Sequence, residues 1–269
     1  MRAWPLLRML ALVALASPSL MAQVSPADQV QIGPPALRRA EPPTASASAE
    51  ELEKRGDDLR ADKAYLDALD YYRAALKRKP NDAVLLNKSG IAEIGLLRWK
   101  EARKSFERAI KANRNYPEAY NNLGVIRYLD KKYDKAITQY EKAIKLRSDA
   151  ASYFSNLGAA YFAKKEFEKA DVAYRQALQL DPDIFERVSR SGVAAQLSSP
   201  EDRARFDYVI AKLYAQIGNM DRSLEYLRRA MEEGYKGIDD VYKDAEFAAV
   251  RKDPRFTELM AARPPAIPQ

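Results

Sequence analysis

The feature that most constrains this chain is a repeat of 34 residues. Four glycines share this spacing, and so do two columns of alanines and two columns of aromatic residues. The columns are Gly56, Gly90, Gly124 and Gly158; Ala68, Ala102, Ala136 and Ala170; Ala75, Ala109, Ala143 and Ala177; Tyr72, Phe106, Tyr140 and Tyr174; and Tyr65, Trp99, Tyr133 and Phe167. Five columns with one spacing indicate a structural unit that is copied and stacked.

Each copy contains two helical stretches. In the third copy, Glu118–Leu129 and Tyr133–Leu146 both carry apolar residues at steps of three and four. The intervening Asp130–Lys132 is long enough only for a tight antiparallel turn. Each repeat is therefore predicted to be a helical hairpin, in which small Gly and Ala let the helices approach and the aromatic residues fill the space between them. A single hairpin cannot bury its apolar face, so the hairpins are expected to stack.

The fourth copy carries the motif by which a known family is identified. Its residues at the motif positions are Phe154, Leu157, Gly158, Tyr161, Ala170, Tyr174, Ala177 and Pro182. With these residues the chain resembles the tetratricopeptide repeat family. The resemblance implies an all-α fold, a right-handed α-solenoid of stacked helical hairpins, and protein binding. Glu93 and Arg127 replace the tyrosine of the motif, and we expect them at positions that tolerate solvent.

The first residues predict export. Residues 1–22 have Arg2 and Arg8 around the apolar run Leu10–Ala16, followed by small residues, which is the layout of a signal peptide. Cleavage after Ala22 is favoured over cleavage after Ala16. We expect a periplasmic or extracellular protein with no transmembrane segment in the mature chain. Residues 23–48 are rich in Pro, Ala and Ser and are predicted to be a disordered spacer.

Four repeats follow, over residues 49–184. Their bounds are 49–82, 83–116, 117–150 and 151–184. Beyond them two registers compete, since Gly192, Ala204, Tyr208 and Ala211 keep the old spacing while Ala211, Tyr214 and Ala230 fit one displaced by 19 residues. We favour the displaced register, because Gly218-Asn219 then supplies its turn. It predicts an extra helix within 185–203, a last repeat over 204–237, and a C-terminal cap and tail over 238–269.

Two helix starts are predicted in this last part. Ser199 precedes Pro200 and two acidic residues, which suits the capped, positive end of a helix. Asp253-Pro254 begins another helix in the same way. Apolar residues of the tail are expected to cover the open end of the stack, as solenoids require; they are Val241, Phe247, Val250, Phe256 and Leu259.

The composition excludes several kinds of chemistry. The chain has 269 residues and contains neither Cys nor His, so thiolate catalysis, disulfides and imidazole ligation of metals are excluded. No phosphate-binding Gly loop and no G-x-S-x-G motif is present. We therefore predict that the protein is not an enzyme and needs no cofactor and no metal.

The net charge of +7 is concentrated in the second repeat. Residues 83–116 carry eight Lys and Arg against three acids. The candidate basic patch is Arg98, Lys100, Arg103, Lys104, Arg108, Lys111 and Arg114. It suggests a polyanion-binding protein as an alternative function, with anionic lipid, glycan or nucleic acid as ligand. Export disfavours nucleic acid, and a solvated outer face is the plainer interpretation.

The family resemblance implies a second candidate site. In that family the first helix of each hairpin lines a concave groove that commonly holds an extended peptide. Lys54, Lys88, Asn122 and Asn156 take equivalent positions there. In some relatives an Asn at this place binds peptide backbone amides, whereas two lysines would favour an acidic segment or a carboxylate terminus. Tyr128 and Phe162 are expected to add apolar contact. The alternative is that both Asn side chains only join neighbouring helices.

These features together predict an exported, non-catalytic scaffold. Its groove would hold an extended peptide or a partner protein in a cell-envelope assembly. An accessory subunit of an envelope enzyme or of a secretion machine is an alternative that differs only in its partner.

Overall fold

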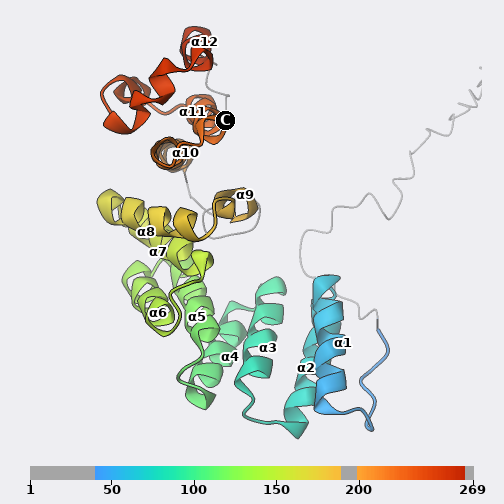
Figure 1. The fold of residues 1–269 in the computed structure, drawn as a ribbon. Coiled ribbons are helices and arrows are strands. Elements are labelled where there is room, and N and C mark those ends of the chain that lie inside the picture. Colours follow the sequence, from blue (N-terminus) through green and yellow to red (C-terminus); the bar gives the residue numbers. More distant parts are fainter. Residues whose placement is uncertain (1–39, 189–198, 264–269) are drawn as a thin grey trace, which may run out of the picture. The chain divides into compact units, whose positions relative to one another are not determined.

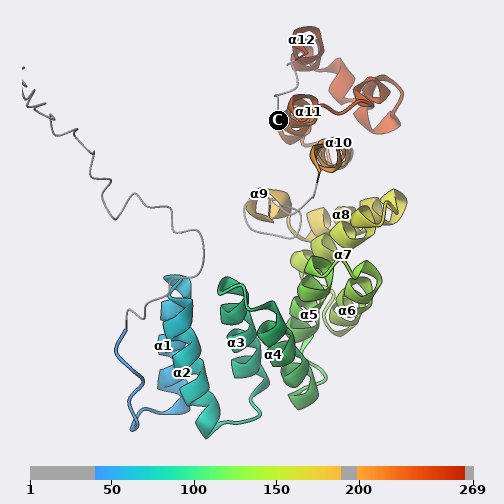
Figure 2. The same ribbon diagram turned by 180° about the vertical axis from the view of Figure 1, so that it is seen from behind.

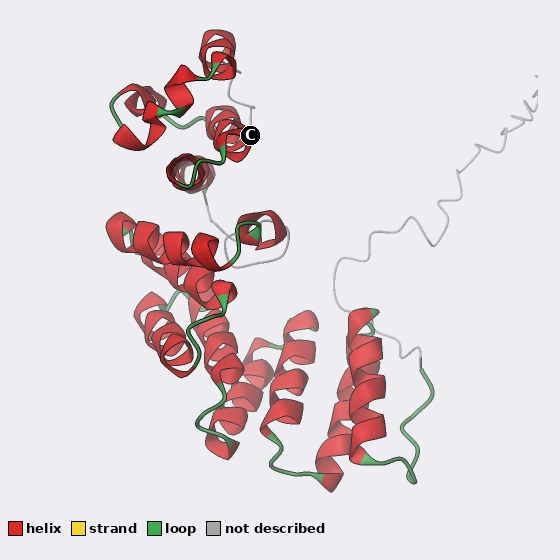
Figure 3. Cartoon of the chain, in the orientation of Figure 1, coloured by secondary structure: helices red, strands yellow, loops and turns green. Residues whose placement is uncertain are grey.

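The computed structural model describes residues 40–188 and 199–263, and every secondary-structure element within these ranges is helical (Figure 3). The predicted signal peptide, residues 23–39 of the predicted spacer, residues 189–198 and the last six residues lie outside this description. The expected all-α class is confirmed.

Four helical hairpins occupy the four repeats in chain order (Figures 1 and 2). Every first helix has 13 residues and every second helix has 14. The pairs are α1 (Ala49–Ala61) and α2 (Tyr65–Arg78), α3 (Ala83–Gly95) and α4 (Trp99–Ala112), α5 (Pro117–Leu129) and α6 (Tyr133–Leu146), and α7 (Ala151–Ala163) and α8 (Phe167–Leu180). The hairpins stack, as the period predicts.

The glycine column explains how closely the two helices of a hairpin approach. Gly124 on α5 faces the ring of Tyr140 on α6, and a Cβ on Gly124 would lie 2.5 Å from Cε1 of that ring. Such a distance is a clash, so the ring occupies the space that a side chain would need. Tyr140 is fully buried, and the glycine and aromatic columns are therefore one packing device repeated in each hairpin.

A left-handed residue closes each hairpin turn. Lys63, Leu97, Lys131 and Lys165 have φ between 57° and 61°. The turn lets the N–H of the following residue bond back across the helix end, for example from Arg98 to the carbonyl of Glu93 at 2.8 Å. This is the Schellman pattern of a helix C-terminus, in which glycine is the usual residue.

The fifth hairpin follows the displaced register. It consists of α10 (Pro200–Gln216) and α11 (Met220–Glu232), with Gly218 (φ 77°) in the turn. Ala211 and Ser223 are both buried at the helix contact, where the Ser223 hydroxyl donates to the Ala211 carbonyl at 3.0 Å. The Ser199 hydroxyl accepts from the Asp202 N–H and so caps α10 as expected.

Aromatic rings connect the fourth hairpin to the fifth. The short helix α9 (Ile184–Val188) places Phe185 5.3 Å from Tyr174, between ring centroids. Phe206 on α10 packs edge to face against Tyr174 at 5.6 Å and against Phe162 at 6.1 Å. Edge-to-face pairs at these distances are favourable, so the cluster replaces the regular contact that the change of register interrupts.

The C-terminal residues cover the last hairpin. Three short 3₁₀ helices, η3 (Ile238–Tyr242), η4 (Ala245–Ala248) and η5 (Val250–Lys252), lead to α12 (Pro254–Ala262), which Asp253 caps. Val241, Phe247, Val250, Phe256 and Leu259 are all buried in one core with α10 and α11.

Residues 40–48 differ from the expectation of disorder. This segment lies along α2 and is called the strap below. The Ala40 N–H donates to the buried carboxylate of Asp67 at 3.1 Å, the Tyr71 hydroxyl donates to the Glu41 carbonyl at 3.0 Å, and Arg78 donates to the Ala45 carbonyl at 2.8 Å. Proline and alanine content gave no sign of these contacts, because α2 provides their side-chain partners.

Glu93 also differs from expectation. Its side chain is buried instead of solvent-exposed, and it accepts a hydrogen bond from the Ser105 hydroxyl at 2.7 Å. Burial raises the pKa of Glu93. Arg127, at the next equivalent position, is partly buried and pairs with Glu107 at 3.1 Å.

Candidate functional site

The predicted row on the first helices reaches backward from hairpin to hairpin. Lys88 Nζ on α3 donates to Glu53 on α1, Asn122 Nδ2 on α5 donates to Asn87 on α3, and Asn156 Nδ2 on α7 donates to Asn121 on α5. Each of these bonds spans 35 residues. The row therefore lies along consecutive first helices and ties each to the preceding one.

The three bonds continue into a chain of amides. Asn156 donates to Asn121 at 2.9 Å, Asn121 donates to Asn122 at 3.2 Å, and Asn122 donates to Asn87 at 2.9 Å. Asn87 in turn donates weakly to the Tyr116 hydroxyl at 3.4 Å. Asn87 and Asn121 are buried, whereas Asn122 and Asn156 are half-buried. The predicted Asn residues thus join helices and also remain in reach of solvent.

The two lysines of the row differ. Lys54 is exposed on α1, whereas Lys88 is half-buried and lies 2.5 Å from both Glu53 Oε1 and Asp57 Oδ2. Burial lowers the pKa of Lys88, but the hydrogen bonds from Asp57 and Glu53 outweigh it and the pKa is raised. Lys88 is therefore a charged bridge between hairpins, and two carboxylates already compensate its charge.

Tyr128 and Phe162 lie in the core. Tyr128 is 6% exposed and its ring is 5.3 Å from that of Tyr133. Phe162 is 2% exposed and packs against Phe167 and Phe206. The structure thus does not bring these rings to the surface of the row, because both point into contacts with the second helices and, for Phe162, with the fifth hairpin.

The structure also shows partners that the sequence argument missed. Glu53, Asn87 and Asn121 occupy a column of their own with the 34-residue spacing, one position before the predicted row. That spacing was a usable signal, since two adjacent polar columns on one helix face can meet across hairpins only at a separation of 35 residues. Asp57, one helical turn after Glu53, completes the site around Lys88.

The candidate basic patch lies on α4 and its flanks. Six of its cations are exposed and Arg103 is half-buried. Arg103 Nε lies 3.9 Å from Glu107, which also pairs with Arg127. The patch is therefore separate from the amide chain, which belongs to the first helices.

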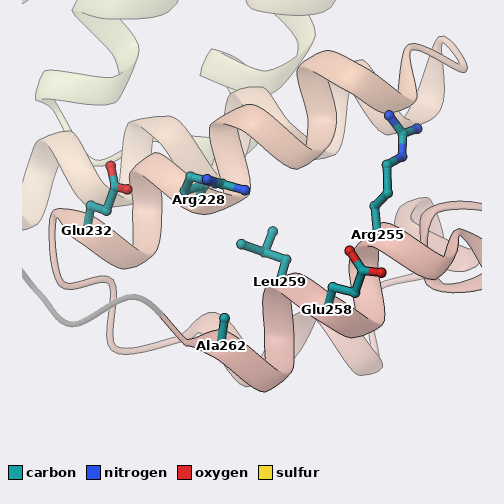
Figure 4. Close-up of a pocket in the computed structure, with 6 residues that line it drawn as sticks. All are labelled: Arg228, Glu232, Arg255, Glu258, Leu259 and Ala262. Carbon is teal, nitrogen blue, oxygen red and sulfur yellow. The ribbon is translucent and has the colours of Figure 1, made fainter.

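A pocket of about 230 Å³ lies between α11 and α12 (Figure 4). Its lining consists of Arg228, Glu232, Arg255, Glu258, Leu259 and Ala262. Arg255 is held by Asp253 and by Asp221 on α11 at 2.6 Å. Two cations and two acids line the pocket, so its charge does not select a ligand.

Two features are absent over residues 40–188 and 199–263. No group of three or more acidic side chains there is placed to hold a metal ion. Within the same ranges, no helix has the length and apolar character needed to cross a bilayer.

Stacked hairpins whose first helices are joined by a polar row define this chain as an α-helical repeat protein. Residues 126–165 match the TPR repeat, and residues 105–138, 151–184 and 205–233 match the tetratricopeptide repeat. The chain therefore belongs to the tetratricopeptide repeat family, through the repeats that these residues form. No curated protein matches the chain.

Solved structures with similar folds include other proteins of this kind. One is MamA from Desulfovibrio magneticus RS-1, with 19% identity over 69% of this chain and 94% of that one and a TM-score of 0.49. A thermophilic TPR protein of Thermus thermophilus has 20% identity over 80% and 100% of the two chains, with a TM-score of 0.49. YrrB, described as a TPR protein with an unusual peptide-binding site, has 18% identity over 76% and 92%, with a TM-score of 0.47.

Proposed function

We propose that this protein is a non-catalytic scaffold that binds an extended peptide segment of a partner protein along its first helices. The observation that carries the proposal is the amide chain through Asn156, Asn121, Asn122 and Asn87. Its two half-buried members, Asn122 and Asn156, lie at equivalent places on consecutive hairpins.

The amides retain capacity for a ligand. A carboxamide has two N–H donors and an oxygen with two lone pairs. Asn122 gives one N–H to Asn87 and accepts one bond from Asn121, and Asn156 gives one N–H to Asn121. Each keeps a second N–H and oxygen capacity that no described residue uses. An amide that both donates and accepts pairs with peptide N–H and C=O groups, so main-chain recognition is the expected mode.

Charge makes a smaller contribution than the two lysines of the row suggest. Lys88 is compensated by Glu53 and Asp57, which leaves Lys54 as the exposed cation of the row. A single exposed cation stabilises an ion pair by about 1 kcal/mol or less. Selection of an acidic or carboxylate-ended segment is therefore weak, and it rests on Lys54.

The partner is proposed to belong to the cell envelope. The support is the N-terminal sequence, which has the layout of a signal peptide. Intact-mass measurement on protein from the native host tests this placement: removal of a leader ending between residues 16 and 22 is expected. Retention of Met1 on cytoplasmic protein would contradict it.

A capture experiment tests the binding proposal. A photo-crosslinking residue at Lys54 is used to trap partners in an envelope fraction, and the trapped segment is synthesised as a peptide. Calorimetry then compares the parent with Asn122→Ala/Asn156→Ala. Two backbone hydrogen bonds at about 0.5–1.5 kcal/mol each predict a loss of roughly tenfold or somewhat more, with little dependence on salt.

The matched control is Arg103→Ala/Lys104→Ala on α4, which should leave peptide affinity unchanged. Thermal melts of both double variants show the temperature at which each is folded, because the Asn changes also remove bonds between hairpins. Normal binding by the Asn variant together with loss of capture by the control would move the binding surface to α4 and overturn the proposal.

A further inference from the structure

The second helix of the second hairpin presents an uninterrupted row of cations. Lys100, Lys104, Arg108 and Lys111 follow one another along α4 at steps of four, four and three residues, which places them on one side of a helix. All four are exposed. Over residues 40–188 and 199–263, no acidic side chain forms an ion pair with any of them.

The acids of this hairpin do little to offset the row. Glu93 is buried beside Ser105, and Glu107 is engaged by Arg127 at 3.1 Å. Glu101 alone remains beside the row as an exposed acid of residues 83–116. The surface of α4 is therefore positive at every step.

The other hairpins show that the fold does not require these cations. The positions of Lys100, Lys104 and Arg108 recur at intervals of 34 residues, so the same fold provides its own comparison. The equivalent residues are Leu66, Asp70 and Ala74 on α2, Asp134, Thr138 and Lys142 on α6, and Glu168, Val172 and Gln176 on α8.

The turn that precedes α4 adds exposed apolar groups. Leu97 is 55% exposed and has φ 58°. The equivalent residue is Lys in three hairpins and Gly in the fifth; Lys suits the negative end of a helix and Gly suits the left-handed backbone. Leu97 has neither advantage and gains little from packing. Trp99, two residues later, is 36% exposed.

We propose that this surface, Leu97 to Lys111, binds anionic lipid bilayers. A cationic row attracts a negative lipid surface, and long Lys and Arg side chains lie well at the headgroup level. Exposed Leu and Trp gain by entering the interface, where tryptophan is favoured. A polyanionic strand in water would use the cations and could stack on Trp99, but it would leave Leu97 without a role. The complete set of residues therefore fits a bilayer, and the attachment is peripheral.

The test uses vesicles of phosphatidylglycerol and phosphatidylcholine, with pure phosphatidylcholine vesicles as reference. Each basic residue near an anionic surface contributes about a fivefold gain in partitioning. Lys100→Gln/Lys104→Gln/Arg108→Gln should therefore partition about a hundredfold more weakly than the parent. The matched control, Arg228→Gln/Lys236→Gln/Lys252→Gln, removes three exposed cations of the C-terminal part and should partition like the parent. Equal losses in both variants, or no binding of the parent to anionic vesicles at low salt, would overturn the proposal.

Leu97→Gly separates a bilayer from a charged polymer. The change removes the apolar side chain and suits the left-handed backbone, so the fold is retained. Partitioning should fall about tenfold, and the loss should persist in high salt, where the charge contribution is screened. If Leu97→Gly partitions like the parent while the parent binds a single-stranded oligonucleotide as tightly as vesicles, the ligand is a polyanionic strand and the lipid proposal is wrong.

Discussion

The ammonium of Lys88 lies 2.5 Å from a carboxylate oxygen of Asp57, which belongs to the preceding hairpin. The side chains of Lys88 and Asp57 are 21% and 33% exposed, so the pair is partly withdrawn from water. Breaking such a pair on one side leaves the remaining charge uncompensated, which costs more than the loss of an exposed ion pair.

Lys88→Ala is therefore expected to lower the free energy of unfolding by about 1–3 kcal/mol. Lys54→Ala, at the equivalent position on α1, should change it by about 0.5 kcal/mol or less, because Lys54 is exposed. Urea unfolding followed by circular dichroism measures both. Equal effects of the two changes would show that the bridge does not stabilise the stack.

Gly124→Ala should destabilise the third hairpin by about 1–3 kcal/mol through overpacking against Tyr140. The ring is fully buried and has no room to move aside. The same change in a Tyr140→Leu background should cost clearly less, since the smaller side chain leaves space for the new methyl group. A double-mutant cycle on thermal melts gives the coupling, and strict additivity would rule out the contact as the cause.

Tyr140→Phe is expected to raise stability by about 1 kcal/mol. The hydroxyl of Tyr140 is buried and has no hydrogen-bond partner among the described residues, and burial raises its pKa well above the ordinary value. Tyr72, the equivalent residue of the first hairpin, donates to Asp57 at 2.8 Å and accepts from Arg60 at 3.2 Å. Tyr72→Phe should therefore lower the melting temperature, and a fall for both variants would reject the argument.

Asp207 on α10 predicts a dependence of stability on pH. Burial raises the pKa of Asp207 to about 7, against the opposing effect of Arg229. The folded state then binds a proton between about pH 4 and pH 7 that the unfolded chain has released, so this group lowers stability as pH rises through that range. Asp207→Asn should stabilise the protein by about 1–2 kcal/mol at pH 8 and have little effect at pH 4. Denaturation at both pH values measures the difference, and an equal gain at both would contradict it.

The hairpins were predictable because their determinants are local. Gly124 and Tyr140 are 16 residues apart and recur with one spacing, so the contact is written in the sequence four times. The displaced last repeat was predictable for a similar reason, since Gly218 marks its turn.

The details of the polar row were not predictable to the same degree. The position of Asn122 followed from the 34-residue column, but its partner Asn87 depends on how consecutive first helices are rotated against each other. The same rotation decides that Tyr128 faces the core instead of the surface of the row. Glu93 was misplaced because its stabilising partner, Ser105, comes from the other helix of the hairpin. Single-residue character could not show either arrangement.

The strap has a consequence for the length of the assembly. Residues 40–48 bond to α2 through Asp67, Tyr71 and Arg78, and the C-terminal cap buries apolar residues against α11. A solenoid with bare ends can join head to tail with its copies and grow into an open filament. Covered at both ends, this stack has a terminus in each direction, and the number of hairpins in one chain sets the size of the particle.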